Sequence, residues 1–272
     1  MAAFDTMNLD CIDLNCDVGE LPQAVFDGTQ DALMASITSA NVACGGHAGD
    51  RRMMEATIRQ ALWHGVCVGA HPGFPDRANF GRLAMSMTAA QIAETVREQV
   101  EALSQVAQHC GAPVGHVKAH GALYNLAARD ARVALAIADG VARWRRDVVL
   151  IGLAGSVMLE VFQKVGFDVV GEAFVDRRYE ADGSLRSRKL PDALIRDPQA
   201  AAEQALRIAR SQRVVASDGS EIALQAQTLC IHGDTPGSVQ IAAAVAFRLR
   251  QAGIELKGRR ASRRNPEKGR GE

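Results

Sequence analysis

The fold is decided by the stretch Ile12-Asp-Leu-Asn-Cys-Asp17, in which apolar and polar side chains alternate with a period of two. Because residues two apart in a strand share a face, Asp13, Asn15 and Asp17 lie on one side of the expected strand and apolar residues on the other. The apolar face can pack against helices. The stretch therefore predicts a strand whose second face carries polar groups into an interior or a cleft.

Six further stretches have the composition of short buried strands, and helical patterns separate them. The expected strands are residues 40–44, 66–71, 115–120, 148–154, 168–175 and 228–232. The expected helices are residues 50–64, 88–110, 129–144, 156–165, 198–210 and 238–252. Asp50 and Thr88 are good helix caps, and Gly65 and Gly111 are good stops.

Seven strand–helix units with short connections imply a parallel sheet. We expect an α/β protein with a single-domain, TIM-like β/α barrel of seven units, which forms the catalytic domain over residues 1–256. An open, doubly wound sheet is the alternative. No glycine-rich dinucleotide fingerprint follows the first strand to favour it.

Composition excludes several classes of partner. The formal net charge is zero, but residues 257–272 hold seven basic and two acidic side chains, so the rest of the chain is mildly acidic. An acidic body does not indicate a nucleic-acid surface.

Residues 1–14 show no signal peptide, and no apolar stretch approaches the roughly 20 residues of a membrane helix. Four of the six cysteines lie in apolar runs, as buried free thiols do, and we expect a cytoplasmic protein.

Two insertions and a tail interrupt the repeating pattern. Residues 177–198 form a polar insertion, and residues 214–224 resemble a small hairpin around Asp218-Gly219. Residues 257–272 lack apolar periodicity, and we expect a basic disordered tail.

Polar side chains gather toward the carboxyl ends of five expected strands. In the fourth strand His116, Lys118 and His120 share a face, and in the last strand His232 and Asp234 do so. The carboxyl end of a β/α barrel is the rim where such enzymes build their sites. Five strands with the same pattern predict a polar active-site mouth.

The histidines divide by position. Those at strand exits, where we favour function, are His47, His71, His120 and His232. His64 and His109 end helices before glycine and are expected to be structural. His116 enters its strand early, which predicts a hydrogen-bonded core histidine. Asp13 and Glu172 could be satisfied ions of the barrel interior or functional groups.

With these residues in view, the chain resembles the LamB/YcsF family in seven ordered motifs. They are Asp13-Leu-Asn-Cys-Asp-Val-Gly-Glu20, Ser39-Ala-Asn-Val-Ala-Cys-Gly-Gly-His-Ala-Gly-Asp50, Gly69-Ala-His-Pro-Gly-Phe-Pro-Asp-Arg77, His116-Val-Lys-Ala-His-Gly-Ala-Leu-Tyr-Asn125, Gly152-Leu-Ala-Gly155, Glu172-Ala-Phe-Val-Asp-Arg-Arg-Tyr179 and Cys230-Ile-His-Gly-Asp234. The resemblance covers nearly the whole chain apart from the tail.

The resemblance implies a barrel related to the glycoside hydrolase/deacetylase superfamily, working with subunits B and C of a 5-oxoprolinase. It also implies an ATP-hydrolysing cyclic amide hydrolase that converts 5-oxoproline to L-glutamate. Two departures bear on the site. Leu21-Pro22 replaces the usual glycine and phenylalanine after the first motif, and Ala119 replaces a usual proline between Lys118 and His120.

The implied reaction sets the catalytic assignments. Phosphorylation of the lactam oxygen would give an imidate that water can attack, so the site needs a cation, a base and an acid. We assign Lys118 as the cation, and a simple ion pair with Asp13 or Asp17 is its alternative. Asp17 is the expected general base or metal ligand, with His120 or His71 as the acid.

The remaining assignments concern binding. Arg77 or Arg178 could grip the substrate carboxylate through the guanidinium fork, and Asn15 and Asn41 would orient the substrate or a carboxylate. The full set expected to bind substrate is Asn15, Asn41, Arg77, Arg178, His232 and Asp234.

A divalent metal (magnesium, manganese or zinc) could be bound by Asp17, His47 and His71, with His120 as the alternative to His71. ATP is expected as co-substrate, although the chain has no Walker sequence. Gly45, Gly46 and His47 precede a helix start that could cradle a phosphate. The sequence leaves open whether ATP binds this chain or a partner.

Two other functions stay open. A stand-alone metal-dependent deacetylase or amidase would hydrolyse without ATP. A non-catalytic subunit would bind substrate and present it to a partner. A homo-oligomer is also compatible with the sequence.

Overall fold

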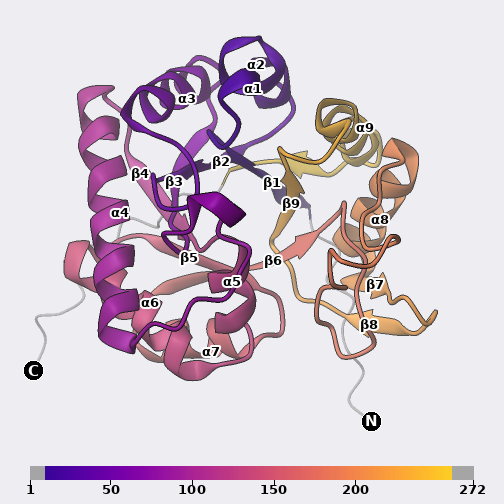
Figure 1. Ribbon diagram of the computed structural model, residues 1–272. Helices are drawn as coiled ribbons and strands as arrows, with labels where there is room; N and C mark the ends of the chain where they lie inside the picture. Colours follow the sequence, from indigo (N-terminus) through magenta and orange to yellow (C-terminus); the bar gives the residue numbers. More distant parts are fainter. Residues whose placement is uncertain (1–9, 259–272) are drawn as a thin grey trace, which may run out of the picture.

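The structure, a computed structural model, describes residues 10–258 and contains a closed barrel of seven parallel strands (Figure 1). Around the ring the strands are β1 (Cys11–Val18), β2 (Ser39–Ala43), β3 (Cys67–His71), β4 (Val114–Lys118), β5 (Val149–Leu153), β6 (Asp168–Phe174) and β9 (Thr228–His232). The ring closes because β9 pairs with both β6 and β1. The predicted barrel is therefore confirmed, and the open sheet was the wrong alternative.

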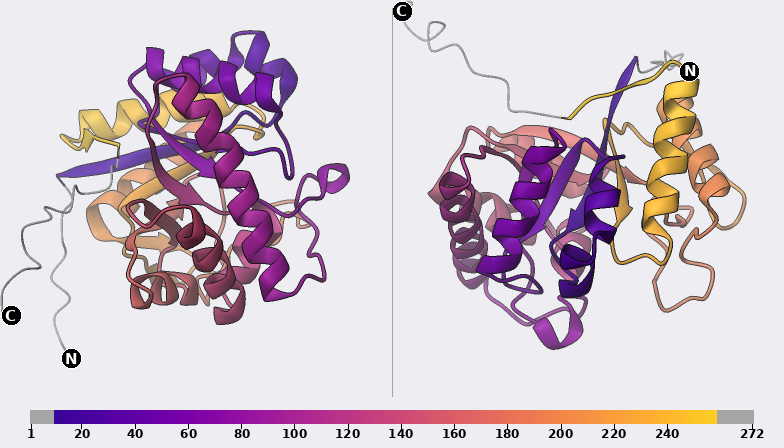
Figure 2. Two further views of the ribbon diagram at one scale, coloured as in Figure 1. Left: turned by 90° about the vertical axis from the view of Figure 1, so that its left-hand side faces the viewer. Right: turned by 90° about the horizontal axis from the view of Figure 1, so that it is seen from above.

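Helices pack around the outside of this ring (Figures 1 and 2). The long ones are α3 (Arg51–Trp63), α4 (Ala89–His109), α6 (Ala131–Trp144), α7 (Val157–Lys164), α8 (Pro198–Ser211) and α9 (Ser238–Gln251). Asp50 caps α3 by accepting from the amide of Met53, and Thr88 forms a capping box with Gln91 at the start of α4. All six helices lie where the sequence predicts them, within about two residues.

Several short elements were not predicted. They are α1 (Pro22–Phe26), α2 (Thr29–Met34), the 3-10 helix η1 (Arg77–Asn79), α5 (Gly121–Ala127) and β10 (Glu255–Leu256). β10 extends the sheet by pairing with the first two residues of β1. The hairpin expected at residues 214–224 is present as β7 (Arg213–Val215) and β8 (Glu221–Ala223), which pair antiparallel.

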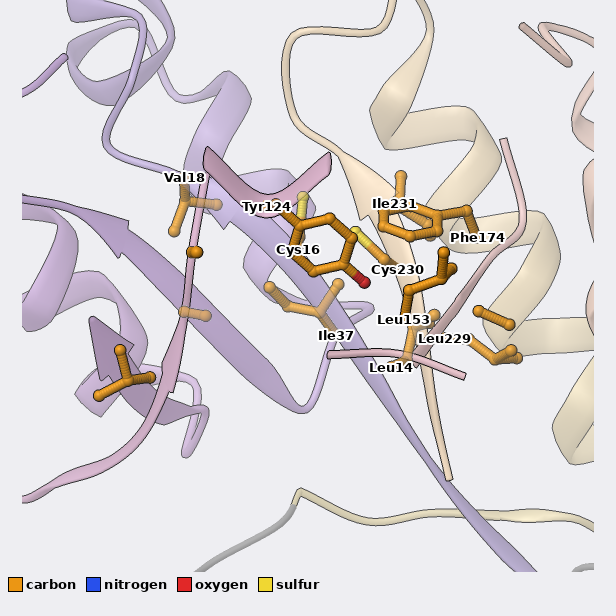
Figure 3. Close-up of a cluster of buried hydrophobic side chains, with 14 of the residues drawn as sticks. Leu14, Cys16, Val18, Ile37, Tyr124, Leu153, Phe174, Leu229, Cys230 and Ile231 are labelled. Carbon is orange, nitrogen blue, oxygen red and sulfur yellow. The ribbon is translucent and has the colours of Figure 1, made fainter. Parts of the chain in front are cut away.

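The outward faces of the strands build the apolar core. Leu14 and Cys16 on β1 and Leu229 and Ile231 on β9 are completely buried (Figure 3). Burying a large apolar side chain contributes roughly 1.5–3 kcal/mol, so this face stabilises the sheet-and-helix contact. As expected from the alternation in residues 12–17, the apolar face of β1 packs against helices.

The interior of the barrel is filled by side chains of unequal size. Val149, Ile151 and Val170 form a separate apolar cluster on β5 and β6. On β3 a Cβ at Gly69 would lie 2.0 Å from Nε2 of His116, so only glycine leaves room for that ring. His116 is completely buried and bonds Asn41, as expected of a core histidine.

Three expectations about the chain as a whole meet the structure here. Residues 257–258 continue from β10, with the Lys257 amide donating to Ile12, whereas the rest of the predicted tail lies outside the described residues. All six cysteines are free, but Cys67 is only half-buried rather than buried. Among residues 10–258, no helix has the length and apolar character needed to cross a membrane.

Candidate functional site

A pocket of about 370 Å³ opens at the carboxyl ends of the strands. Its volume lies within the range of small-molecule sites. The predicted site residues that line it are Asp17, His71, Lys118, His120, His232 and Asp234. The structure therefore brings together groups from β1, β3, β4 and β9, as the expected rim requires.

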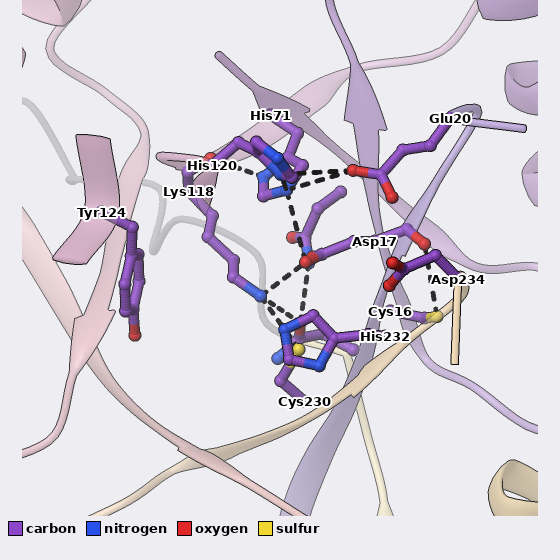
Figure 4. A network of polar contacts seen from close by, with 12 residues as sticks. Cys16, Asp17, Glu20, His71, Lys118, His120, Tyr124, Cys230, His232 and Asp234 are labelled. Carbon is purple, nitrogen blue, oxygen red and sulfur yellow. Dashed lines mark hydrogen bonds and ion pairs between the residues drawn. The ribbon is translucent and has the colours of Figure 1, made fainter. Parts of the chain in front are cut away.

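Lys118 is the centre of a buried ionic network (Figure 4). Its Nζ lies 2.9 Å from Asp17 Oδ1 and 2.8 Å from Glu172 Oε1, and it also contacts Cys230 Sγ at 3.0 Å. Burial would lower the pKa of Lys118, but the charges of Asp17, Cys230 and Glu172 raise it well above its usual value. The lysine is thus a fixed cation, paired with Asp17 and Glu172 and not with Asp13.

The Asp17 carboxylate is held from three sides. Asn41 Nδ2 donates to its Oδ1 at 2.8 Å, Lys118 binds the same oxygen, and His71 Nε2 lies 3.3 Å from Oδ2. Burial alone would raise the pKa of Asp17, but His71 and Lys118 hold it well below its ordinary range. Asp17 therefore stays ionised at the pocket wall.

His71 and His120 turn the same kind of atom toward each other. Nδ1 of His71 donates to the carbonyl of Lys118 at 2.8 Å, and Nε2 of His120 donates to the carbonyl of Phe80 at 2.9 Å. The two remaining ring nitrogens lie only 3.0 Å apart. In neutral rings both of these nitrogens are acceptors, so a proton or a metal ion must lie near them.

Glu20 and His47 complete this cluster. Glu20 Oε1 lies 2.9 Å from His47 Nε2, 3.2 Å from His120 Nδ1 and 3.8 Å from His71 Nε2. Burial raises the pKa of Glu20, but hydrogen bonds from His120 and His47 bring it below its usual value. Burial lowers the pKa of His47 to about 4, so this ring is neutral at physiological pH.

The donor set fits a divalent metal ion. One ligand atom from each of Glu20, His47, His71 and His120 lies within 4.8 Å of the others. Imidazole and carboxylate ligands suit zinc or manganese, and the carbonyl bonds of His71 and His120 orient rings as they do in metal sites. Compared with the expected set, Glu20 is added, both His71 and His120 belong to the group, and Asp17 lies at its edge through its contact with His71.

His232 faces the pocket from β9 as half of a carboxylate–imidazole pair. Its Nδ1 lies 3.0 Å from both carboxylate oxygens of Asp176, and its ring stacks on Phe174 at 5.2 Å. Because Nδ1 donates to Asp176, Nε2 is left as the reactive nitrogen of His232. Burial raises the pKa of Asp176, and His232 lowers it to a net value below the usual one.

Several predicted residues do not reach the pocket. Asn15 and Asn41 lie beneath it, completely buried, with Asn15 donating to Glu172 at 2.9 Å. They orient carboxylates, and neither lines the cavity. Arg77 donates to the carbonyls of Gly45 and Gly49, and Arg178 is exposed.

The expected phosphate cradle is closed by its own contacts. The carbonyl of Gly45 accepts from Arg77, and a Cβ at Gly46 would lie 2.3 Å from the Gln99 side chain. Neither glycine lines the pocket. Arg77 thus stabilises the loop through its carbonyls, which is the opposite of a loop that offers amides to an anion.

Besides Lys118, five basic groups line the pocket, and they were not predicted from the sequence. They are Arg82, Arg177, Arg186, Arg188 and Lys189. Four of them belong to the insertion at residues 177–198. The polar composition of this insertion did not indicate that it would lie against the pocket. Asp234, predicted to bind substrate, pairs with Arg82 and lies 3.4 Å from Arg188. Glu20 could have been found, since it ends the first motif.

Comparisons with known proteins agree with this geometry. The model of the LamB/YcsF family matches residues 12–264. A protein of Chloroflexus aggregans that is named as the A subunit of 5-oxoprolinase is 48% identical over 246 residues, covering 90% of this chain and 98% of the relative. A Bordetella pertussis protein of the same name is 47% identical over 245 residues, covering 90% and 97%.

A solved structure agrees as well. The crystal structure of the lactam utilization protein from Thermus thermophilus is 42% identical to this chain. It superposes with a TM-score of 0.85 and covers 92% of this chain and 100% of its own.

Proposed function

This chain belongs to the LamB/YcsF family, and from that premise we propose that it opens the ring of 5-oxoproline as the A subunit of an ATP-dependent 5-oxoprolinase. The relatives that carry the name of this subunit support the role in lactam hydrolysis. The observation that carries the proposal is the charged pair of Lys118 and Asp17 beside His71 and His120 at the base of one pocket. Subunits B and C are the expected partners, in the cytoplasm.

In the proposed reaction, water adds to the lactam carbonyl carbon and the bond from that carbon to nitrogen breaks. An amide is a poor electrophile, so ATP first phosphorylates its oxygen and leaves as ADP. Addition of water and cleavage of the bond to nitrogen then give an acyl phosphate, and a second water releases phosphate to give glutamate. Lys118 keeps its charge beside the pocket and stabilises negative charge on that oxygen or its phosphoryl group. Because Gly45 and Gly46 do not line the pocket, we do not assign them to nucleotide binding.

Proton transfer falls to Asp17 and His232. The ionised carboxylate of Asp17 accepts a proton from the attacking water. Nε2 of His232, oriented by Asp176, returns a proton to the leaving nitrogen. This assignment moves the acid from His71 or His120 to His232, because Asp176 gives that ring the orientation of a proton donor.

The residues that would hold a divalent metal ion are Glu20, His47, His71 and His120. Bound there, the ion would supply a Lewis acid that eases deprotonation of water. The buried carboxylates Asp17, Glu20 and Glu172 outnumber the single ammonium group of Lys118. A cation, or protons on the imidazoles, would balance this negative charge.

The test is reconstitution with the candidate subunits B and C. We expect 5-oxoproline-dependent ATP hydrolysis and matching L-glutamate formation only when all three subunits are present. Hydrolysis of amides by this chain alone, without ATP, would instead indicate the metal-dependent amidase. If substitutions at the pocket changed only the affinity for 5-oxoproline and not the chemical step, the chain would be a binding subunit.

A further inference from the structure

Arg177 is a buried cation at the wall of the pocket. It follows β6 by three residues, is only 5% exposed, and lines the cavity. Its Nη2 donates to the carbonyl of Arg186 at 2.7 Å, which fixes the direction of the guanidinium. Within residues 10–258, its Nε has no hydrogen-bond partner.

The other arginines of the pocket have counter-ions, and Arg177 does not. Arg82 and Arg188 pair with Asp234, and Arg186 pairs with Glu180 at 2.9 Å. In the described part of the chain, no ion pair joins Arg177 to a carboxylate, and Asp176 pairs with His232 instead. A buried charge without a partner is strongly unfavourable, so the fold leaves a place here for an anion.

The nearest acid cannot fill that place. Asp176 precedes Arg177 in the chain, but its carboxylate accepts from His232 Nδ1 and from Thr235 Oγ1 at 2.9 Å. Burial and the neighbouring charge of Arg188 lower the pKa of Arg177 to about 10, which still leaves it charged at neutral pH. Arg177 is therefore a cation whose nearest carboxylate, Asp176, is committed to His232 and Thr235.

We propose that Arg177 is the anchor for the carboxylate of the lactam substrate, with Arg188 as the second cation of this subsite. The inference rests on the proposed function and names the group that selects 5-oxoproline over a neutral lactam. A guanidinium matches a carboxylate because it offers two parallel donors. The lactam ring then extends toward Lys118, since Arg177, after β6, and Lys118, at the end of β4, line the same cavity across β5.

The test uses two nearly isosteric ligands, L-5-oxoproline and its carboxamide, which differ in the charge that Arg177 would bind. Calorimetry on the purified chain measures both dissociation constants. We expect the wild type to bind the acid at least ~10-fold more tightly, and Arg177→Met to weaken the acid by at least ~30-fold while leaving the amide unchanged. Arg196→Met, an exposed arginine of the same insertion, is the matched control and should keep the wild-type preference.

Loss of the Arg186 contact could loosen the insertion, and the ligand pair separates that effect from loss of charge. A loosened insertion weakens the acid and the amide alike. Arg177→Gln keeps a donor for the Arg186 carbonyl and removes the charge. If the methionine variant does not fold, the affinities of the glutamine variant for the acid and the amide are compared instead. A preference for the acid that survives in these variants, or is missing in the wild type, overturns the proposal.

Turnover by the reconstituted complex separates this inference from the proposed function. A wild-type chain that prefers the acid through Arg177 but supports no glutamate formation contradicts only the function. A complex that forms glutamate equally well with wild type and Arg177→Gln contradicts only the carboxylate subsite.

Discussion

Two layers of polar residues inside the barrel use the same residue types and differ in how their hydrogen bonds are satisfied. The inner layer consists of Asp13, Asn15, Asn41, His116 and Thr228, all completely buried. Its members bond one another, as when Thr228 donates to Asp13 and Asn41 donates to Asn15 at 2.7 Å. None of its members lines the pocket.

The rim layer consists of Asp17, Glu20, His71, Lys118, His120 and His232, all of which line the pocket. In this layer Nε2 of His71 and Nδ1 of His120, both acceptors in neutral rings, lie 3.0 Å apart. Nε2 of His232 is a free imidazole nitrogen on a residue that lines the cavity. A polar residue on the lumen side of a strand is therefore structural when its hydrogen bonds go to buried neighbours, as those of Asp13 do, although Nδ1 of His116 has no partner within residues 10–258. It is a candidate for function when its remaining capacity points at a ligand.

The largest expected effect is that of Lys118→Met. Turnover by the reconstituted complex should fall to background, because the cation beside the reacting oxygen is lost. The variant also leaves Asp17 and Glu172 unpaired in a buried site, which should lower the free energy of unfolding by about 3–5 kcal/mol. Glutamate formation and denaturant unfolding check both results.

Lys164→Met is the matched control, because its ion pair with Glu160 at 3.6 Å is exposed. It should change stability by no more than about 1 kcal/mol and leave turnover unchanged. Full turnover in Lys118→Met would remove this lysine from the site.

The next effect sharpens the role of the histidine cluster. Glu20→Gln should weaken zinc or manganese binding by about 10–100-fold, because an anionic ligand becomes neutral. Equilibrium dialysis with elemental analysis measures the affinity. Glu203→Gln, at an exposed ion pair with Arg248, should leave it unchanged. A wild-type chain that binds neither metal would show that protons alone hold the cluster together.

The smallest effect concerns pH and the two buried neutral histidines. Burial lowers the pKa of His47 to about 4 and that of His116 to about 3, against 6.5 in an unfolded chain. Between pH 6.5 and 4 the unfolded state therefore binds more protons, and stability must fall as the pH is lowered. Each group contributes at most about 1.4 kcal/mol per pH unit.

Denaturant unfolding at pH 7.5, 6 and 5 measures this slope. His116→Gln should flatten it, whereas His109→Gln, on the surface, should leave it as in the wild type. Stability that stays constant from pH 7.5 to 5 would mean that these rings are not buried in the neutral form.

The sequence predicted the barrel because each strand carries its own periodic pattern and each long helix its own cap. It also predicted that five side chains lie together at the carboxyl ends of the strands, since the face that a residue takes in a strand and the strand's direction are local properties. They are Asp17, His71, Lys118, His120 and His232. These predictions needed no knowledge of the loops. The strand β10, with only two paired residues, is too short to give such a pattern.

Residues on loops were not predictable in this way. Arg77 and Arg178 were expected to bind substrate, but the path of a loop depends on contacts that have no period in the sequence. Arg77 turns to the carbonyls of Gly45 and Gly49, and the adjacent Arg177, rather than Arg178, faces the cavity. The cluster around Glu20 likewise depends on where the chain turns after β1.

The most direct test compares two aspartates that lie four residues apart on the same face of β1. Turnover per folded molecule is measured as glutamate formed by the reconstituted complex with Asp17→Asn or Asp13→Asn. We predict that Asp17→Asn loses turnover, while Asp13→Asn keeps it and is only less stable, because Asp13 bonds Thr38, Ser39 and Thr228. Full turnover with Asp17→Asn, or equal loss in both variants, would contradict the separation of a catalytic rim from a structural interior.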